Sequence, residues 1–223
     1  MKLYCLNSCT MEIASGRLKV EKTARYFVNG DPQLPYDEVV FVLHGYGMKA
    51  DDFLKSFAIL ERPGRLIVAP EGLSRFYKKA FSGDVVASWM TKEDRLSEIE
   101  DYITYLDKLF SVFVKDSSVK PTVIGFSQGT ATASRWIMNG KSQVENFVIW
   151  CGEFARDYGT IPSKLPKIWH VYALKDEFIA LDRFEDQSEF LKSIGFQVVD
   201  FSFDGGHTID EPTLQEVSKA MSV

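Results

Sequence analysis

The chain has 223 residues, 45% of them hydrophobic, and a formal net charge of −5 at pH 7. This length and composition are typical of one globular unit with a substantial core, and we expect a single domain over residues 1–223. The acidic balance argues against nucleic acid and anionic membrane surfaces as partners, because both attract clustered Lys and Arg.

Neither a secretory signal nor a membrane-spanning segment is expected. Residues 1–15 contain no continuous apolar run of the length found in signal peptides, and no later segment approaches the length of a membrane span. The three cysteines, Cys5, Cys9 and Cys151, are too few for a disulfide framework, and their spacing does not resemble a zinc site. We therefore expect reduced thiols, a cytoplasmic location, no stable membrane insertion and no bound metal. The oligomeric state stays open.

The first third of the chain predicts alternating strands and helices. We expect a strand over residues 18–28, closed by a turn at 29–32. A continuous apolar run at 38–43 is typical of a parallel strand buried on both faces. A helix over 51–61 and a buried strand over 65–69 follow, and Pro70 ends that strand.

Residues 71–90 fit no regular pattern. They contain the aromatic residues Phe76, Tyr77, Phe81 and Trp89. A long aromatic loop is uncommon unless it forms a lid or a pocket wall, so we expect one of these here.

The rest of the chain continues the alternation. Thr91 is expected to cap a long helix, whose apolar residues recur at steps of three and four: Leu96, Ile99, Ile103, Leu106, Phe110 and Phe113. Strands are predicted at 121–124, 146–150, 168–174 and 196–203, and helices at 130–138, 183–194 and 211–221. Such alternation predicts an α/β fold: a mostly parallel central sheet with helices on both faces and a minimal cap domain or none.

One short segment points to chemistry. Between the strand at 121–124 and the helix at 130–138 stands Gly125-Phe126-Ser127-Gln128-Gly129. A serine on a sharp strand-to-helix turn is the nucleophile elbow of an α/β-hydrolase, and its flanking glycines avoid collisions with neighbouring backbone. The alternative is an ordinary serine that caps the helix.

A serine nucleophile needs a base and a group that orients it. His207 follows two glycines after a predicted strand, where a side chain can project into a cleft, and we expect it to be the base. His44 is expected to brace a loop, and His170, inside a strand, to be a packed core residue. The acid should lie between Ser127 and His207 in the chain, and Asp176 stands where a strand ends. The competing acids, which lie toward or within a helix, are Glu177, Asp182, Asp186 and Glu189.

The oxyanion that forms during acyl transfer needs two main-chain N–H donors. Gln128 follows the nucleophile and should supply one, and Tyr46, in the loop His44-Gly45-Tyr46-Gly47, should supply the other. We also expect an apolar acyl pocket lined by Tyr46, Trp89 and Trp150.

With these pieces in order, the chain resembles the phospholipase/carboxylesterase family of α/β-hydrolases, which includes the acyl-protein thioesterases and small bacterial carboxylesterases. The matching pieces are residues 43–47, 68–70, 88–89 and 125–129, with Asp176 and Gly206-His207. The resemblance implies hydrolysis of small-molecule esters or thioesters without a cofactor.

The chain also departs from the family's usual pattern. Thr130 stands where the family elbow usually has another glycine, and Cys151 replaces the serine of a usual Ser-Gly pair. Ala87 stands where a proline often precedes Ser88-Trp89, and Leu174 and Lys175 precede Asp176 without the frequent glycine. Two alternatives remain open: a non-catalytic ligand-binding protein of the same fold, and an acyltransferase or peptidase that uses the same three residues.

Overall fold

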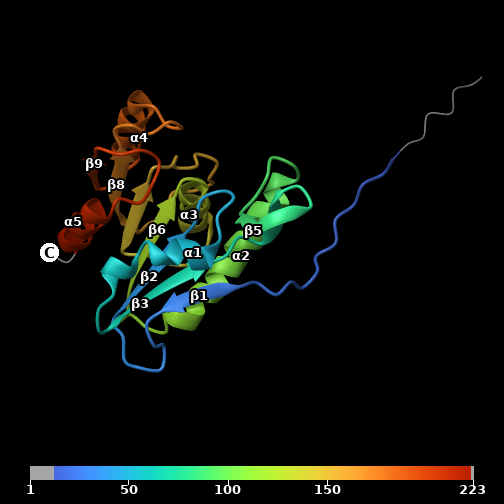
Figure 1. Cartoon of the computed structure of the whole chain (residues 1–223), viewed down its shortest axis with the longest axis horizontal. Coiled ribbons are helices and arrows are strands. Elements are labelled where there is room, and N and C mark those ends of the chain that lie inside the picture. Colours follow the sequence, from blue (N-terminus) through green and yellow to red (C-terminus); the bar gives the residue numbers. More distant parts are fainter. Residues whose placement is uncertain (1–12, 222–223) are drawn as a thin grey trace, which may run out of the picture.

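The computed structural model describes residues 13–221. Its main element is a seven-stranded sheet in the order β1-β3-β2-β6-β7-β8-β9, with β1 and β9 at opposite edges (Figure 1). Only β1 is antiparallel to its neighbour, β3, and the other pairings are parallel. The strands are β1 (Tyr26–Asn29), β2 (Glu38–Leu43), β3 (Arg65–Pro70), β6 (Lys120–Phe126), β7 (Asn146–Trp150), β8 (Lys167–Ala173) and β9 (Val198–Phe203).

Helices cover both faces of the sheet, because the central strands are apolar on both sides. Val39, Phe41 and Leu43 of β2 pack toward α2 (Arg95–Phe113), α3 (Gln128–Asn139) and α4 (Leu181–Ser193). Val40 and Val42 pack toward α1 (Ala50–Lys55), the 3₁₀ turn Ala58–Leu60 and α5 (Glu211–Met221). The predicted architecture, an α/β fold with a mostly parallel central sheet and helices on both faces, is confirmed.

The expectation of a long loop at 71–90 is wrong. This segment forms an antiparallel hairpin of β4 (Ser74–Lys79) and β5 (Ser82–Ser88), separate from the main sheet. The hairpin lies beside α2, at the right of the molecule in Figure 1. Sequence periodicity misses it because its outer residues face water on both sides, and Phe81 at its tip is 97% exposed.

Other expectations at the start of the chain need correction. Of the strand expected at 18–28, only residues 26–28 pair with a neighbour, in β1, which extends to Asn29; residues 13–25 have no regular secondary structure. The long helix begins at Arg95 instead of being capped by Thr91, whose N–H bonds Glu98. Its buried face contains Tyr102, whereas Leu96 is exposed.

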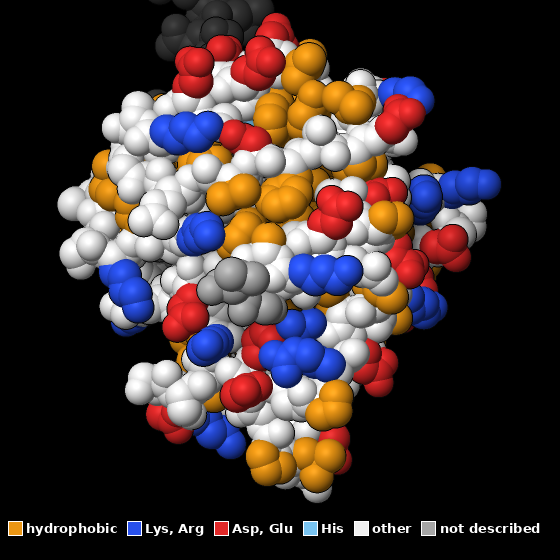
Figure 2. Space-filling view, turned by 90° about the vertical axis from the view of Figure 1, so that its left-hand side faces the viewer, with side chains coloured by type: hydrophobic (Ala, Val, Ile, Leu, Met, Phe, Trp, Pro, Cys, Tyr) orange, Lys and Arg blue, Asp and Glu red, His pale blue; other side chains and the backbone are white. Residues whose placement is uncertain are grey.

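The surface is mixed in character, and none of the helices in the described part of the chain is long and apolar enough to cross a membrane. On the side of α4, β9 and α5, hydrophobic side chains lie exposed between charged ones (Figure 2). Of the three cysteines, Cys5 and Cys9 lie outside the described residues, and Cys151 is a buried free thiol.

Candidate active site

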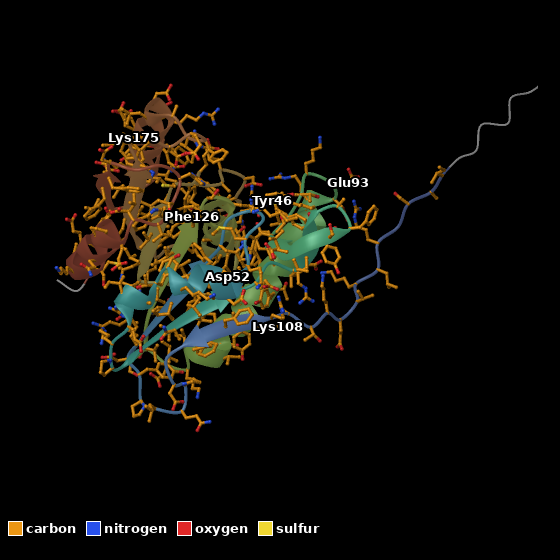
Figure 3. All side chains as sticks on the ribbon, viewed as in Figure 1. Tyr46, Asp52, Glu93, Lys108, Phe126 and Lys175 are labelled. Carbon is orange, nitrogen blue, oxygen red and sulfur yellow. The ribbon has the colours of Figure 1, made fainter. Side chains whose placement is uncertain are left out.

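Residues that the sequence singled out converge at one edge of the sheet. Since β2, β6, β8 and β9 run parallel, their carboxyl ends meet at that edge. His44, Ser127, Asp176 and His207 lie in the four turns that follow these strands. In Figure 3, Phe126 at the end of β6 lies between Tyr46, from the loop after β2, and Lys175, from the loop after β8.

Ser127 occupies a strained backbone conformation between β6 and α3. Its φ of 53° and ψ of −120° lie in a region that side chains rarely adopt. The turn is tight because its glycines permit close approach. A Cβ on Gly125 would lie 2.6 Å from the Cα of Thr130, and one on Gly129 would lie 2.8 Å from the carbonyl oxygen of His44. The turn therefore places the half-buried Ser127 at the N-terminus of α3, where free N–H groups favour negative charge.

His207 and Asp176 form a hydrogen-bonded pair. Nδ1 of His207 lies 2.8 Å from Oδ2 of Asp176, and their side chains are only 11% and 2% exposed. The pairing places the imidazole proton on Nδ1, which leaves Nε2 with a free lone pair. The His207 ring is held between the rings of Phe126 and Phe178, with centroids 4.9 Å and 4.8 Å away.

The second oxygen of Asp176 fixes the loop after β8. Oδ1 accepts the main-chain N–H groups of Phe178 and Ile179 at 2.8 Å and 3.1 Å. Burial opposes ionisation of this carboxyl group, but the hydrogen bonds from His207 and from these two amides outweigh it, so the pKa of Asp176 lies below its ordinary value. The carboxylate is thus charged at neutral pH and can orient the imidazole.

The loop after β2 is held against the elbow. A Cβ on Gly45 would lie 3.2 Å from the Cβ of Ser127, so this loop passes directly beside the serine. His44 is fully buried, its Nδ1 lies 2.7 Å from the carbonyl oxygen of Gly45, and its Nε2 accepts the N–H of Gly72. Burial lowers the pKa of His44, so the ring is neutral and braces the loop.

Gln128 anchors a third segment to the elbow through its side chain. Its Oε1 accepts the N–H of Trp89 at 3.2 Å, and its Nε2 donates to the carbonyl oxygen of Met90 at 2.9 Å. The side chain of Gln128 is therefore occupied, and its main-chain N–H stands in the first turn of α3, beside Ser127. Tyr46 is 61% exposed and packs on Phe76 of the hairpin, with ring centroids 5.5 Å apart.

Trp89 and Trp150 do not offer a pocket surface. They are 1% and 0% exposed, so almost none of either side chain can reach a substrate in this structure. Their indole N–H groups instead hold the site's loops. Trp89 donates to the carbonyl oxygen of His44 at 2.8 Å, and Trp150 donates to that of Thr208, next to His207, at 2.8 Å.

His170 lies in the core, in the middle of β8. It is 1% exposed, stacks on Phe184, and its Nδ1 lies 3.2 Å from Asp200. Burial lowers the pKa of His170 below its ordinary value. The competing acid Glu177 does approach the site, because its Oε2 accepts the main-chain N–H of His207 at 3.3 Å.

Sequence reasoning missed two neighbours of the pair. Phe178 contacts the His207 ring although it is 73% exposed, and no sequence pattern predicts that contact. Cys151 was noted only as a departure from a family pattern, yet it lies beside Asp176. Burial, together with the Asp176 carboxylate, raises the pKa of the Cys151 thiol well above its ordinary value, so this thiol is protonated at neutral pH.

Comparison with known proteins agrees with this architecture. The family model for phospholipase/carboxylesterase matches residues 26–223, and the chain belongs to that family. No curated protein matches the chain.

Solved structures with the same fold include several hydrolases. Esterase PE8 is 17% identical with a TM-score of 0.72, over 89% of this chain and 98% of that one. Acyl-protein thioesterase 2 of Zea mays is 19% identical with a TM-score of 0.69, over 90% and 98%. The carboxylesterase of Bacillus cereus is 14% identical with a TM-score of 0.66, over 89% and 93%.

Proposed function

We propose that this protein is a serine hydrolase that cleaves carboxylic esters or thioesters through an acyl-enzyme on Ser127. The observation that carries the proposal is the 2.8 Å pair of His207 and Asp176 at the same sheet edge as the strained Ser127. No cofactor enters the proposed reaction. We further infer one domain and a cytoplasmic location, as the sequence predicts.

The proposed reaction begins with proton transfer. Nε2 of His207 accepts the proton of the Ser127 hydroxyl as the oxygen attacks the acyl carbon. Asp176 keeps the other ring nitrogen protonated and stabilises the imidazolium that forms. The proton then passes to the leaving alcohol or thiol, and a water molecule releases the acyl group by the same steps in reverse.

The oxyanion of the tetrahedral intermediate is proposed to bind the main-chain N–H groups of Tyr46 and Gln128. Each such donor typically lowers the barrier by about 3–4 kcal/mol. Support comes from the closeness of Gly45 to Ser127 and from the start of α3 at Gln128. The hydrogen bonds of His44 and Trp89 hold this loop in place.

The acyl group is proposed to lie against exposed apolar side chains around the triad. Tyr46, Phe178 and Leu174 are 61%, 73% and 55% exposed, on the loops after β2 and β8. A methylene group buried there would contribute about 0.8 kcal/mol, which is roughly fourfold in kcat/KM per methylene until the surface is covered. We therefore expect short to medium acyl chains to be preferred.

A panel of p-nitrophenyl esters from acetate to decanoate, with acyl-CoA thioesters of the same lengths, tests this function. We expect turnover that rises and then falls with acyl length, and no turnover by Ser127→Ala. Hydrolysis that Ser127→Ala retains would contradict the mechanism. A folded wild-type protein that binds such acyl compounds without cleaving them would favour the non-catalytic alternative, and transfer to added alcohols or amines in preference to water would favour an acyltransferase.

A further inference from the structure

Cys151, at the end of β7, adds a third donor to the pair of Asp176 and His207. Its sulfur, a carboxylate oxygen of Asp176 and a ring nitrogen of His207 all lie within 4.8 Å of one another. Among residues 13–221, no other three His, Cys, Asp or Glu side chains come together in this way. The chain separates these residues by 25 and 31 positions, which is why the spacing of cysteines and histidines does not reveal the cluster.

The backbone holds the thiol firmly in this place. Cys151 has a φ of 44°, in the left-handed region, and its N–H donates to the carbonyl oxygen of Val171 at 2.9 Å. Gly152 is tightly enclosed, because a Cβ there would lie 2.5 Å from Cβ of Thr130, and its carbonyl oxygen accepts Nε2 of Gln187. The sulfur is therefore preorganised beside the carboxylate.

A small cavity adjoins the thiol and the carboxylate. Its volume is about 10 Å³, and it is lined by Cys151 and Asp176, two of the three donors, but not by His207. That space is about the size needed for one water molecule or a small ion. Among the charged side chains that line the cavity, Arg183 and Glu153 pair with each other through a salt bridge of 2.5 Å. The Asp176 carboxylate lies beside the thiol and favours a cation there over an anion.

The donor types select the kind of cation. Sulfur, imidazole nitrogen and carboxylate oxygen together suit Zn²⁺ and similar ions, whereas Mg²⁺ and Ca²⁺ prefer oxygen ligands alone. Bond lengths of about 2.0–2.3 Å to zinc imply donor separations near about 3.5 Å in a tetrahedral site. Nδ1 of His207 and Oδ2 of Asp176 are only 2.8 Å apart, so binding must open their hydrogen bond and separate these two atoms by about 0.7 Å. The sulfur of Cys151 lies within 4.8 Å of the donor atoms of both side chains.

We propose that Cys151, Asp176 and His207 bind a thiophilic divalent cation, with Zn²⁺ as the probe, and that the bound ion blocks hydrolysis. Binding displaces the thiol proton, which leaves to solvent, and a sulfur–metal bond forms. Nδ1 of His207 binds the ion through its lone pair, so the ring proton moves from Nδ1 to Nε2. With Nε2 protonated, His207 has no lone pair for the Ser127 proton. The inhibition rests on the proposed function, whereas the binding of the ion does not.

The test separates binding from inhibition. Metal-free protein is titrated with Zn²⁺ by calorimetry and with Co²⁺ by absorption, because a thiolate bound to Co²⁺ gives a charge-transfer band. We expect one ion per chain, one proton released per ion, and an affinity at least about tenfold weaker in Cys151→Ser. The matched control, Cys5→Ser with Cys9→Ser, removes the other thiols and should bind as the wild type does.

Ester hydrolysis by the same variants is then measured with and without Zn²⁺. We expect Zn²⁺ to inhibit the wild type and the control at concentrations that leave Cys151→Ser active, with activity restored by a chelator. If Cys151→Ser does not fold, Cys151→Ala replaces it. Equal Zn²⁺ affinity in wild type and variant, or no binding by the wild type, would overturn the site. Binding by a protein that hydrolyses no ester without Zn²⁺ would uphold the site and contradict the proposed function instead.

Discussion

Gly129→Ala should damage stability and catalysis together, because Gly129 sets how closely α3 approaches β2. An added Cβ would lie 2.7 Å from the carbonyl carbon of Leu43 and 2.8 Å from the carbonyl oxygen of His44, and closer still to the oxygen of Leu43. Ordinary carbon contacts are about 3.5–4.0 Å, so the loop after β2 must move away from the elbow by about 1 Å. Overpacking of this kind costs about 1–3 kcal/mol in the free energy of unfolding.

The same shift moves the proposed oxyanion donor Tyr46 away from Ser127. A misplacement of about 1 Å typically lowers kcat by about 10²-fold, and the stability loss lowers Tm by roughly 2–12 °C in a chain of this size. Thermal unfolding and hydrolysis of p-nitrophenyl butyrate measure both effects. Gly159→Ala is the matched control, because no heavy atom lies within 4 Å of its added Cβ. Equal Tm and equal kcat in Gly129→Ala and Gly159→Ala would contradict the proposed role of Gly129.

Two further predictions concern side chains that support the site. Trp150→Phe removes the indole N–H that holds the carbonyl of Thr208 at 2.8 Å. Leaving that carbonyl unpaired costs about 1–3 kcal/mol, and we expect kcat to fall about tenfold with KM little changed. Trp169→Phe is the control, because its N–H bonds Asn146 at the opposite end of the sheet; equal kcat in both variants would contradict a role for Trp150. The second prediction concerns pH: burial lowers the pKa of His44 and His170, so the unfolded chain binds protons that the folded chain does not. The stability that these histidines contribute is complete above about pH 6.5 and is lost as the pH falls, by at most about 1.4 kcal/mol per histidine at pH 5.5. Urea unfolding gives the free energy of unfolding at pH 7.5 and at pH 5.5. The difference between these two values should be smaller in His170→Gln than in the wild type, and an equal difference in both proteins would contradict a contribution from His170.

The buried elements were predictable from the sequence because the parallel sheet requires apolar residues on both faces of a strand. The runs at Glu38–Leu43 and Asn146–Trp150 correspond to strands with those bounds. Peripheral elements were not predictable in the same way. The hairpin of β4 and β5 is exposed over residues 77–85 and is stabilised by contacts with distant segments, such as the pair of hydrogen bonds between Ala87 and the loop at Gly47 and Met48.

The candidate site likewise contains residues that could be predicted from the sequence and residues that could not. Ser127, Asp176 and His207 could be proposed because each stands where a strand ends, and topology alone brings such ends together. The roles of Trp89 and Trp150 could not be predicted, since an indole can either line a pocket or donate its N–H in the core, and only packing decides between the two. The cluster around Cys151 likewise depends on the order of β7, β8 and β9 in space.

Covalent labelling of the proposed nucleophile tests the account most directly. A fluorophosphonate reacts with a serine that a neighbouring base activates, and peptide mass spectrometry identifies the labelled residue. We expect one label per chain, on the peptide that contains Ser127, with labelling slowed at least about 10³-fold in His207→Gln. No label on Ser127 in the folded wild type, or equal labelling rates in the wild type and His207→Gln, would contradict a hydrolase in which His207 activates Ser127.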